Sequence, residues 1–255
     1  MCGRYALTAT PGDVAEAFGL AGLEAFPPRY NIAPTQPILV VRAGEKGPPG
    51  SNLPERRALL ARWGFTPAWV KDPATFPLLI NARSETAAEK ASFRAAMRHR
   101  RIVVPASGFY EWHRPAKGSG LPSQAYWVHP RRGGLVAFGG VMETWASADG
   151  SEVDTVAILT TRATGPMAAV HERMPVVIAQ EEMNRWLDCL RQEPRDVADL
   201  MRPPPEDAFE LIPVSDRVNK VSDTHPDIQA PVVPQPVKGE TPGMQKPRSS
   251  QLSLF

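Results

Sequence analysis

The stretch Leu135-Val136-Ala137-Phe138-Gly139-Gly140-Val141 points most directly to the fold class. Short runs rich in valine, isoleucine and aromatic residues are typical of β-strands, and a second such run extends from Thr155 to Thr161. Because regular alternation of strands and helices is absent, we expect an α+β fold with a curved, mostly antiparallel sheet. The same composition predicts further strands at residues 38–43, 58–65, 102–105, 125–128, 174–178 and 209–214.

Three helical segments are predicted between these strands. Thr10 is the expected N-cap of a short helix that ends at Gly19. Residues 84–101 are predicted to be mostly helical. A third, amphipathic helix, which would include Cys189 as a residue without a role, is predicted from the spacing of Met183, Trp186, Leu187 and Leu190.

The composition is that of a globular protein with a full hydrophobic core: of 255 residues, 42% are hydrophobic and 22% charged. Two cysteines argue against a disulfide framework and a zinc site, and we expect neither a metal nor a cofactor. The sequence has no apolar run of transmembrane length and no secretory signal, so we expect a cytoplasmic protein without membrane contact. A net charge of +2 permits nucleic-acid binding without indicating it.

The composition changes near Gln229. Residues 229–250 are rich in proline, glycine, glutamine and serine, which predicts a disordered linker after a folded domain at residues 1–228. The linker leads to three large apolar side chains at residues 251–255. This segment either folds back onto the domain or binds a hydrophobic groove on a partner.

Cys2 carries the most specific chemistry in the sequence. Removal of Met1 would leave a free α-amine and a thiol on one residue, with pKa values of about 8 and about 8.5. The amine can form a Schiff base with a carbonyl, and the thiol can then close a five-membered thiazolidine ring. Such a residue is suited to an aldehyde or an acyl group, although a cysteine at position 2 also arises by accident.

Three further segments carry polar groups suited to a site. Asn81 and Arg83 lie two residues apart at a predicted strand-to-helix corner, where an amide can orient a polar group and a guanidinium can bind phosphate. Glu111 lies among aromatic residues and is suited to proton transfer. His171 enters a predicted strand and can act as an acid or a base. Each also has an ordinary structural explanation: a turn, a solvent-facing strand position, or a hydrogen-bonded core histidine.

Trp69 is the aromatic counterpart of these polar groups. An exposed tryptophan provides a stacking platform for an unpaired base, whereas a buried one is part of the core.

Together the motifs resemble the SOS-response-associated peptidase (SRAP) family. The likeness extends from Cys2 to about Ile228. It rests on seven ordered blocks: Cys2-Gly3-Arg4-Tyr5, Tyr30-Asn31-Ile32-Ala33-Pro34-Thr35, Trp63-Gly64-Phe65-Thr66-Pro67, Asn81-Ala82-Arg83-Ser84-Glu85-Thr86, Pro105-Ala106-Ser107-Gly108-Phe109-Tyr110-Glu111-Trp112, Thr160-Thr161-Arg162-Ala163 and His171-Glu172-Arg173-Met174-Pro175.

The resemblance implies a barrel-like β core flanked by helices, and a DNA-damage protein that senses abasic sites in single-stranded DNA. It implies that Cys2 captures the aldehyde of the ring-opened sugar in a covalent cross-link. The other implied catalytic roles are proton transfer by Glu111, assistance to imine formation by His171, and positioning of Cys2 or the sugar by Asn81. The implied DNA-binding residues are Arg4 and Arg83 for phosphates and Trp69 and Trp112 for flanking bases.

The last five residues resemble the pentapeptide by which bacterial polymerases and repair proteins bind the replicative sliding clamp. A glutamine amide would orient the peptide, and apolar side chains would fill the clamp's pockets. The resemblance implies that the protein binds the clamp through Gln251, Leu252, Leu254 and Phe255. We also expect a monomer that associates with the nucleoid.

Two other functions stay open. One is a thiol peptidase that uses Cys2 as its N-terminal nucleophile and at least removes Met1. The other is a non-catalytic single-strand DNA-binding module that the clamp recruits.

Overall fold

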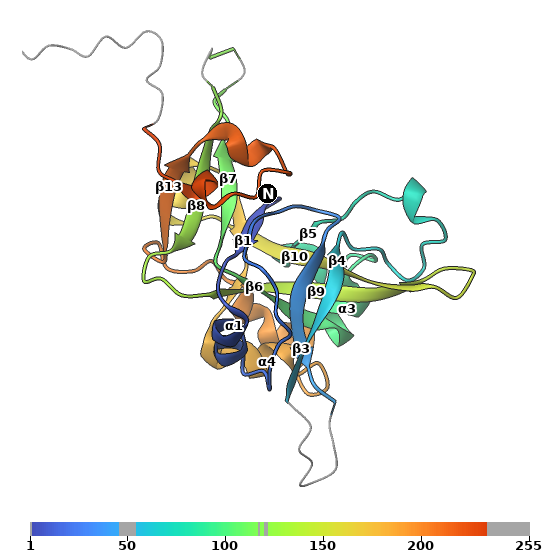
Figure 1. The fold of residues 1–255 in the computed structure, drawn as a ribbon. Coiled ribbons are helices and arrows are strands. Elements are labelled where there is room, and N and C mark those ends of the chain that lie inside the picture. The colour runs from blue at the N-terminus through green and yellow to red at the C-terminus, as the bar shows by residue number, and fades with distance from the viewer. Residues whose placement is uncertain (1, 46–54, 117, 120–121, 234–255) are drawn as a thin grey trace, which may run out of the picture.

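Two curved sheets form most of the molecule (Figure 1). The structure is a computed structural model, and it describes residues 2–45, 55–116, 118–119 and 122–233. The first sheet has the strand order β13-β8-β7-β1-β2. Its strands are β1 (Tyr5–Leu7), β2 (Arg29–Ile32), β7 (Gly108–His113), β8 (Gln124–Pro130) and β13 (Phe209–Val214).

The second sheet has the order β11-β10-β4-β3-β6-β9-β12, and β5 also pairs with β10. Its pairings are antiparallel except for β4 and β5, which run parallel to β10. Its strands are β3 (Pro37–Ala43), β4 (Arg56–Trp63), β5 (Asn81–Arg83), β6 (Arg101–Ala106), β9 (Val136–Ala146), β10 (Glu152–Arg162), β11 (Arg173–Pro175) and β12 (Val177–Ile178).

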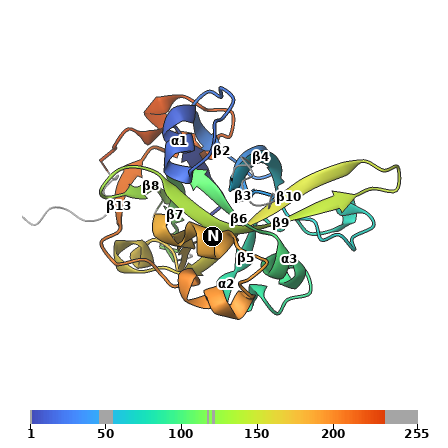
Figure 2. The ribbon, with the colours of Figure 1, turned by 90° about the horizontal axis from the view of Figure 1, so that it is seen from below.

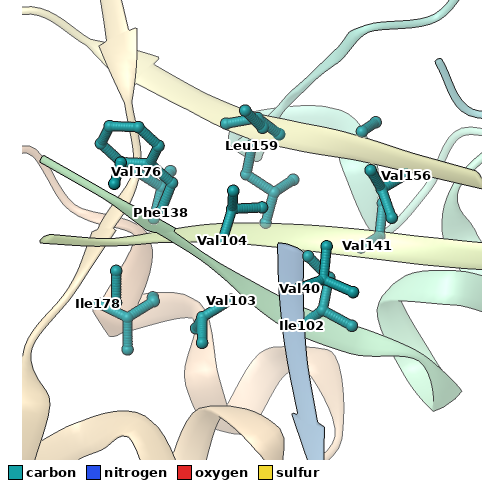
Figure 3. Packing of buried hydrophobic residues seen from close by; sticks show 14 of the residues in the cluster. Val40, Ile102, Val103, Val104, Phe138, Val141, Val156, Leu159, Val176 and Ile178 are labelled. Atoms are coloured by element: carbon teal, nitrogen blue, oxygen red, sulfur yellow. The ribbon is translucent and has the colours of Figure 1, made fainter. Parts of the chain in front are cut away.

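Strand β9 explains why the Leu135–Val141 stretch governs the fold. It pairs with β6 along one edge and with β10 and β12 elsewhere, so its side chains enter the main core (Figure 3). Gly140 allows this close approach, because a Cβ atom there would lie 2.7 Å from Ile102 Cδ1 and 2.9 Å from the Ala157 carbonyl oxygen. Each predicted strand run falls on strands of this core, which confirms the expected α+β fold with a barrel-like, mostly antiparallel β core.

The helices lie on the outside of the β core, and the β9–β10 hairpin projects from it as a long arm (Figure 2). Helix α1 (Pro11–Phe18) is confirmed: Thr10 caps its first turn together with Asp13, and Gly19 ends it at a φ of 61°. The other α-helices are α2 (Ser84–Ala87), α3 (Arg94–His99) and α4 (Met183–Leu187). Single turns of 3₁₀ helix lie at Pro73–Thr75, Gly165–Ala169, Gln180–Glu182, Asp216–Asn219 and Pro226–Gln229, and a longer 3₁₀ segment at Pro194–Met201.

Two predicted helices are shorter than expected. The 84–101 segment divides into α2 and α3, with turns between them that place Phe93 against Phe65 at a ring distance of 5.2 Å. Helix α4 ends at Leu187, so Cys189 lies in a turn and Leu190 is 78% exposed. The prediction of one helix through Leu190 was wrong because hydrogen bonds from the Leu190 and Arg191 N–H groups to Asp188 form that turn.

After β13 the chain returns across the first sheet as a segment that we call the C-terminal strap, residues 215–233. Val218 and Ile228 are fully buried in a small second core beside Tyr110. The strap continues past the expected domain end at residue 228, since the Val232 N–H donates to the Pro213 carbonyl at 2.9 Å. It contacts the N-terminal segment, since the Arg4 Nη1 donates to the Val218 carbonyl at 2.6 Å; the strap is the red end of the ribbon in Figure 1.

Among the residues described, no helix combines the length and apolarity that crossing a membrane requires.

Candidate active site

The N-terminal segment runs beside β7. Strand β1 pairs antiparallel with β7 through Tyr5 and Phe109, and the Tyr110 N–H donates to the Arg4 carbonyl at 2.9 Å. Continued by two residues, this register places Glu111 opposite Gly3. The sequence-predicted nucleophile therefore lies just before β1, and the predicted acid lies on the neighbouring strand β7.

Cys2 is fully buried in the main core. Its thiol points toward the Arg4 carbonyl at a distance of 3.9 Å. Burial, with a smaller effect of the Glu111 charge, raises the pKa of Cys2 to about 12. Near neutral pH the residue is therefore a protonated thiol in this state of the chain.

Asn81 binds the main chain of Cys2 directly. Its Nδ2 donates to the Cys2 carbonyl at 2.8 Å. Strand β5 supplies this amide because it pairs in parallel with β10, with Asn81 opposite Ile158. Among the residues described, the buried Asn81 Oδ1 has no hydrogen-bond partner, so it is available to a donor at Cys2.

Glu111 is 4% exposed on β7. Its Oε1 accepts the Trp112 N–H at 3.2 Å. The β1–β7 register places Glu111 opposite Gly3, the residue that follows Cys2. The prediction of a functional rather than a solvent-facing glutamate is therefore compatible with its burial.

His171 lies two residues before β11. The Arg173 N–H donates to His171 Nδ1 at 2.9 Å, which assigns the proton of the neutral ring to Nε2. Strand β10 lies between β5 and β11, since its Thr160 pairs with Arg83 of β5 and with Pro175 of β11.

Arg173 is a site residue to which sequence reasoning gave no role, although it lies in the His171 motif. Its guanidinium binds Glu85 of α2 in a bidentate pair at 2.7 and 2.8 Å and donates to the Thr160 carbonyl at 2.5 Å. The hydrogen bond from Arg173 lowers the pKa of Glu85. This pair fastens β11 to the corner that carries Asn81.

The two arginines expected to bind phosphate differ in their surroundings. Arg83 is exposed at the end of β5. Arg4 is half-buried, and its Nη1 already donates to Asn31 Oδ1 at 2.8 Å and to the Val218 carbonyl at 2.6 Å. Arg83 is therefore the more accessible cation.

The two tryptophans expected to stack on bases also differ. Trp69 is 60% exposed and packs edge-on against Phe76, but it lies in the loop after β4, next to the arm rather than beside Cys2. The carbonyl of its neighbour Val70 accepts the Trp145 indole N–H, and Trp145 pairs with Val153 of β10. Val153 lies five residues along β10 from Ile158, which pairs with Asn81. That separation is about 17 Å.

Trp112 is half-buried, and its indole N–H donates to Asn219 of the strap at 2.8 Å. The structure thus brings Cys2, Asn81, Glu111 and Arg83 into one region and leaves Trp69 outside it. The predicted clamp-binding residues 251–255 lie outside the described residues.

The fold and this cluster define a β-barrel-like protein with a buried N-terminal cysteine beside an asparagine and a glutamate. The chain belongs to the SOS response associated peptidase (SRAP) family, whose model matches residues 1–221. The predicted family is confirmed.

Relatives and solved structures agree with this assignment. The chain is 33% identical over 231 residues to the abasic site processing protein YoqW of Bacillus subtilis, covering 89% of this chain and 98% of that protein. It is 31% identical to the abasic site processing protein HMCES of Gallus gallus, covering 83% and 69%. A protein structure from Bacteroides thetaiotaomicron has the same fold, with a TM-score of 0.77 at 20% identity over 91% of this chain and 100% of that chain.

Proposed function

We propose that this protein captures abasic sites in single-stranded DNA as a covalent cross-link to Cys2. The observation that carries the proposal is the hydrogen bond from Asn81 to the Cys2 carbonyl, next to a buried glutamate. Two relatives in different domains of life are named abasic site processing proteins, which supports the same substrate.

The reaction requires the free α-amine of Cys2, so removal of Met1 comes first. The amine attacks the C1′ aldehyde of the ring-opened deoxyribose, and loss of one water gives the imine. The thiol sulfur then adds to the imine carbon, and its proton ends on the nitrogen. The product is a thiazolidine, and the balance of the whole reaction is one water released.

The side chains of the site divide the remaining tasks. Glu111 transfers protons to the sugar ring oxygen and to the leaving hydroxyl. Asn81 holds the Cys2 carbonyl with its Nδ2 and offers Oδ1 to the new amine. His171, through its Nε2–H, assists formation or reversal of the imine. Arg83 binds a flanking phosphate.

The test is a denaturing gel of the Met1-processed protein mixed with a single-stranded oligonucleotide that carries one abasic site. We expect a heat-stable shifted band that Cys2→Ala abolishes. Cys189→Ala is the matched control, because it removes the other cysteine of the chain and should leave the band unchanged. Absence of a band from protein with a confirmed Cys2 terminus would contradict the mechanism and leave the peptidase and the passive binding module.

We further propose that residues 251–255 bind the replicative sliding clamp. A linker of about 20 residues has a root-mean-square reach of roughly 25 Å, which would hold the domain near the replication fork. Deletion of these five residues should abolish clamp binding while the cross-link yield on free oligonucleotide stays the same. Clamp binding that survives the deletion would refute this role.

A further inference from the structure

Asn31 of β2 connects the strap to the N-terminal segment. It is 3% exposed, and its Nδ2 lies within hydrogen-bond distance of three strap carbonyls. These are the carbonyls of Asp223 at 2.8 Å, Lys220 at 3.1 Å and Val218 at 3.4 Å. Its Oδ1 accepts the Arg4 guanidinium at 2.8 Å, so both ends of the amide are occupied.

Arg4 links Asn31 and the strap to the segment that contains Cys2. Its Nη1 is shared between Asn31 and the Val218 carbonyl, while its own carbonyl accepts the Tyr110 N–H. Burial lowers the pKa of Arg4, because the charged guanidinium is partly shielded from water. A residue held at its side chain and at its main chain leaves Cys2, two positions away, little freedom to move.

We propose that Asn31 is a positioning residue for Cys2 and that it acts through Arg4. The strap carbonyls hold the Asn31 amide in place. The expected effect on the cross-linking rate rests on the proposed function. Only a primary amide of this length provides donors for the strap and an acceptor for Arg4 at once. An aspartate has no donor for the carbonyls, and an alanine reaches neither side.

The first readout needs no DNA: the rate at which maleimide alkylates Cys2, followed by peptide mass spectrometry so that Cys189 is counted separately. We expect Asn31→Ala to raise this rate by about tenfold, the effect of one lost hydrogen bond to a charged group. Arg4→Ala should raise it equally, and the double variant no further, because the two residues form one link. Unchanged alkylation, or effects that multiply in the double variant, would overturn the proposal.

The second readout is the single-turnover cross-linking rate on an abasic oligonucleotide. We expect Asn31→Ala to lower the maximal rate about tenfold while the half-saturating DNA concentration stays constant, as for a lost positioning interaction. A rise in the half-saturating DNA concentration with an unchanged maximal rate would instead identify Arg4 as a phosphate ligand that Asn31 only orients. That result would overturn the proposal.

Asn184→Ala is the matched control, because exposed Asn184 accepts an arginine, Arg56, at 2.7 Å on α4, away from the strap. It should change neither readout. If Asn31→Ala fails to fold, Arg4→Ala tests the same link from the other side. Failure of the proposed function would appear separately, as a wild-type protein that forms no cross-link but still shows the alkylation pattern.

Discussion

At the residue scale, the thiol of Cys2 lies in the core although its proposed chemistry requires contact with DNA. A buried thiol is a poor nucleophile, because its thiolate is the reactive form and burial disfavours the charge. Removal of Met1 places a charged amine directly at Cys2. We therefore expect the free terminus to be part of the activation, in addition to exposing the amine.

The raised pKa of Cys2 predicts a loss of stability in alkali. The unfolded thiol ionises near pH 9 while the folded one, with a pKa of about 12, keeps its proton, so the unfolded state is stabilised relative to the folded state as pH rises above 9. At pH 10 the loss relative to Cys2→Ala should be about 1 kcal/mol. Chemical denaturation of both proteins at pH 7 and pH 10 measures it. An equal pH dependence in the two proteins would show that the thiol is solvated.

The sequence names candidate site residues but does not predict their contacts. Cys2, Asn81 and Glu111 could be named because their chemistry and motifs are local. Their surroundings could not, since Arg4 donates to the carbonyl of Val218, 214 positions away, and Trp112 donates to Asn219. Only the folded strap creates those partners.

At the element scale, the Glu85–Arg173 pair should fasten β11 to α2 in a pH-dependent way. The lowered pKa of Glu85 means that the pair contributes stability above the unfolded pKa and loses it as pH falls through the folded value. Because the Glu85 side chain is half exposed, we expect Glu85→Gln to cost at most about 1 kcal/mol at pH 7 and almost nothing at pH 3. Thermal melts across this range measure the difference.

Glu45→Gln is the control for that series, because Glu45 forms a more exposed pair with Arg57. It should have little effect at either pH. A constant deficit of Glu85→Gln at all pH values would mean that the glutamate acts through packing rather than charge.

Arg101 should anchor α3 and α4 to the sheet. This buried guanidinium donates to four carbonyls, those of Met97, Trp186, Asp188 and Gln192. We expect Arg101→Met to lower the free energy of unfolding by at least about 3 kcal/mol, because these acceptors lose a charged donor. Arg98→Met in the same basic run should cost less than about 1 kcal/mol, since its pair with Glu193 is exposed. Equal costs in denaturant titrations would contradict this role.

The elements differ in how well the sequence predicted them. Long strands such as β9 and β10 were found because their apolar runs reflect burial on the sheet. Three-residue β1 has no such run, and its pairing with β2 and β7 alone makes it a strand. Helical periodicity overestimated α4, because it cannot detect the Asp188 side chain that forms the turn.

At the scale of the whole molecule, the strap brings the C-terminal end of the folded region into contact with its N-terminal part. The family model ends at residue 221, yet Asp223 supplies a carbonyl to Asn31, and Ile228 is fully buried in the second core. The folded domain therefore continues beyond the matched segment, and its last residues contact the part of the structure that holds the N-terminal segment.

Two truncations test this dependence. A chain ending at Val233 keeps the described strap, so its melting temperature and Cys2 alkylation rate should equal those of the full protein. A chain ending at Val221 exposes the apolar surface that Ile228 covers, which should cost about 2 kcal/mol and lower the melting temperature by several degrees. Its Cys2 should also be alkylated faster, because Asn31 has lost one of its carbonyl partners. A Val221 truncation as stable as the Val233 chain, with Cys2 equally protected, would show that β2 and β7 alone hold the nucleophile.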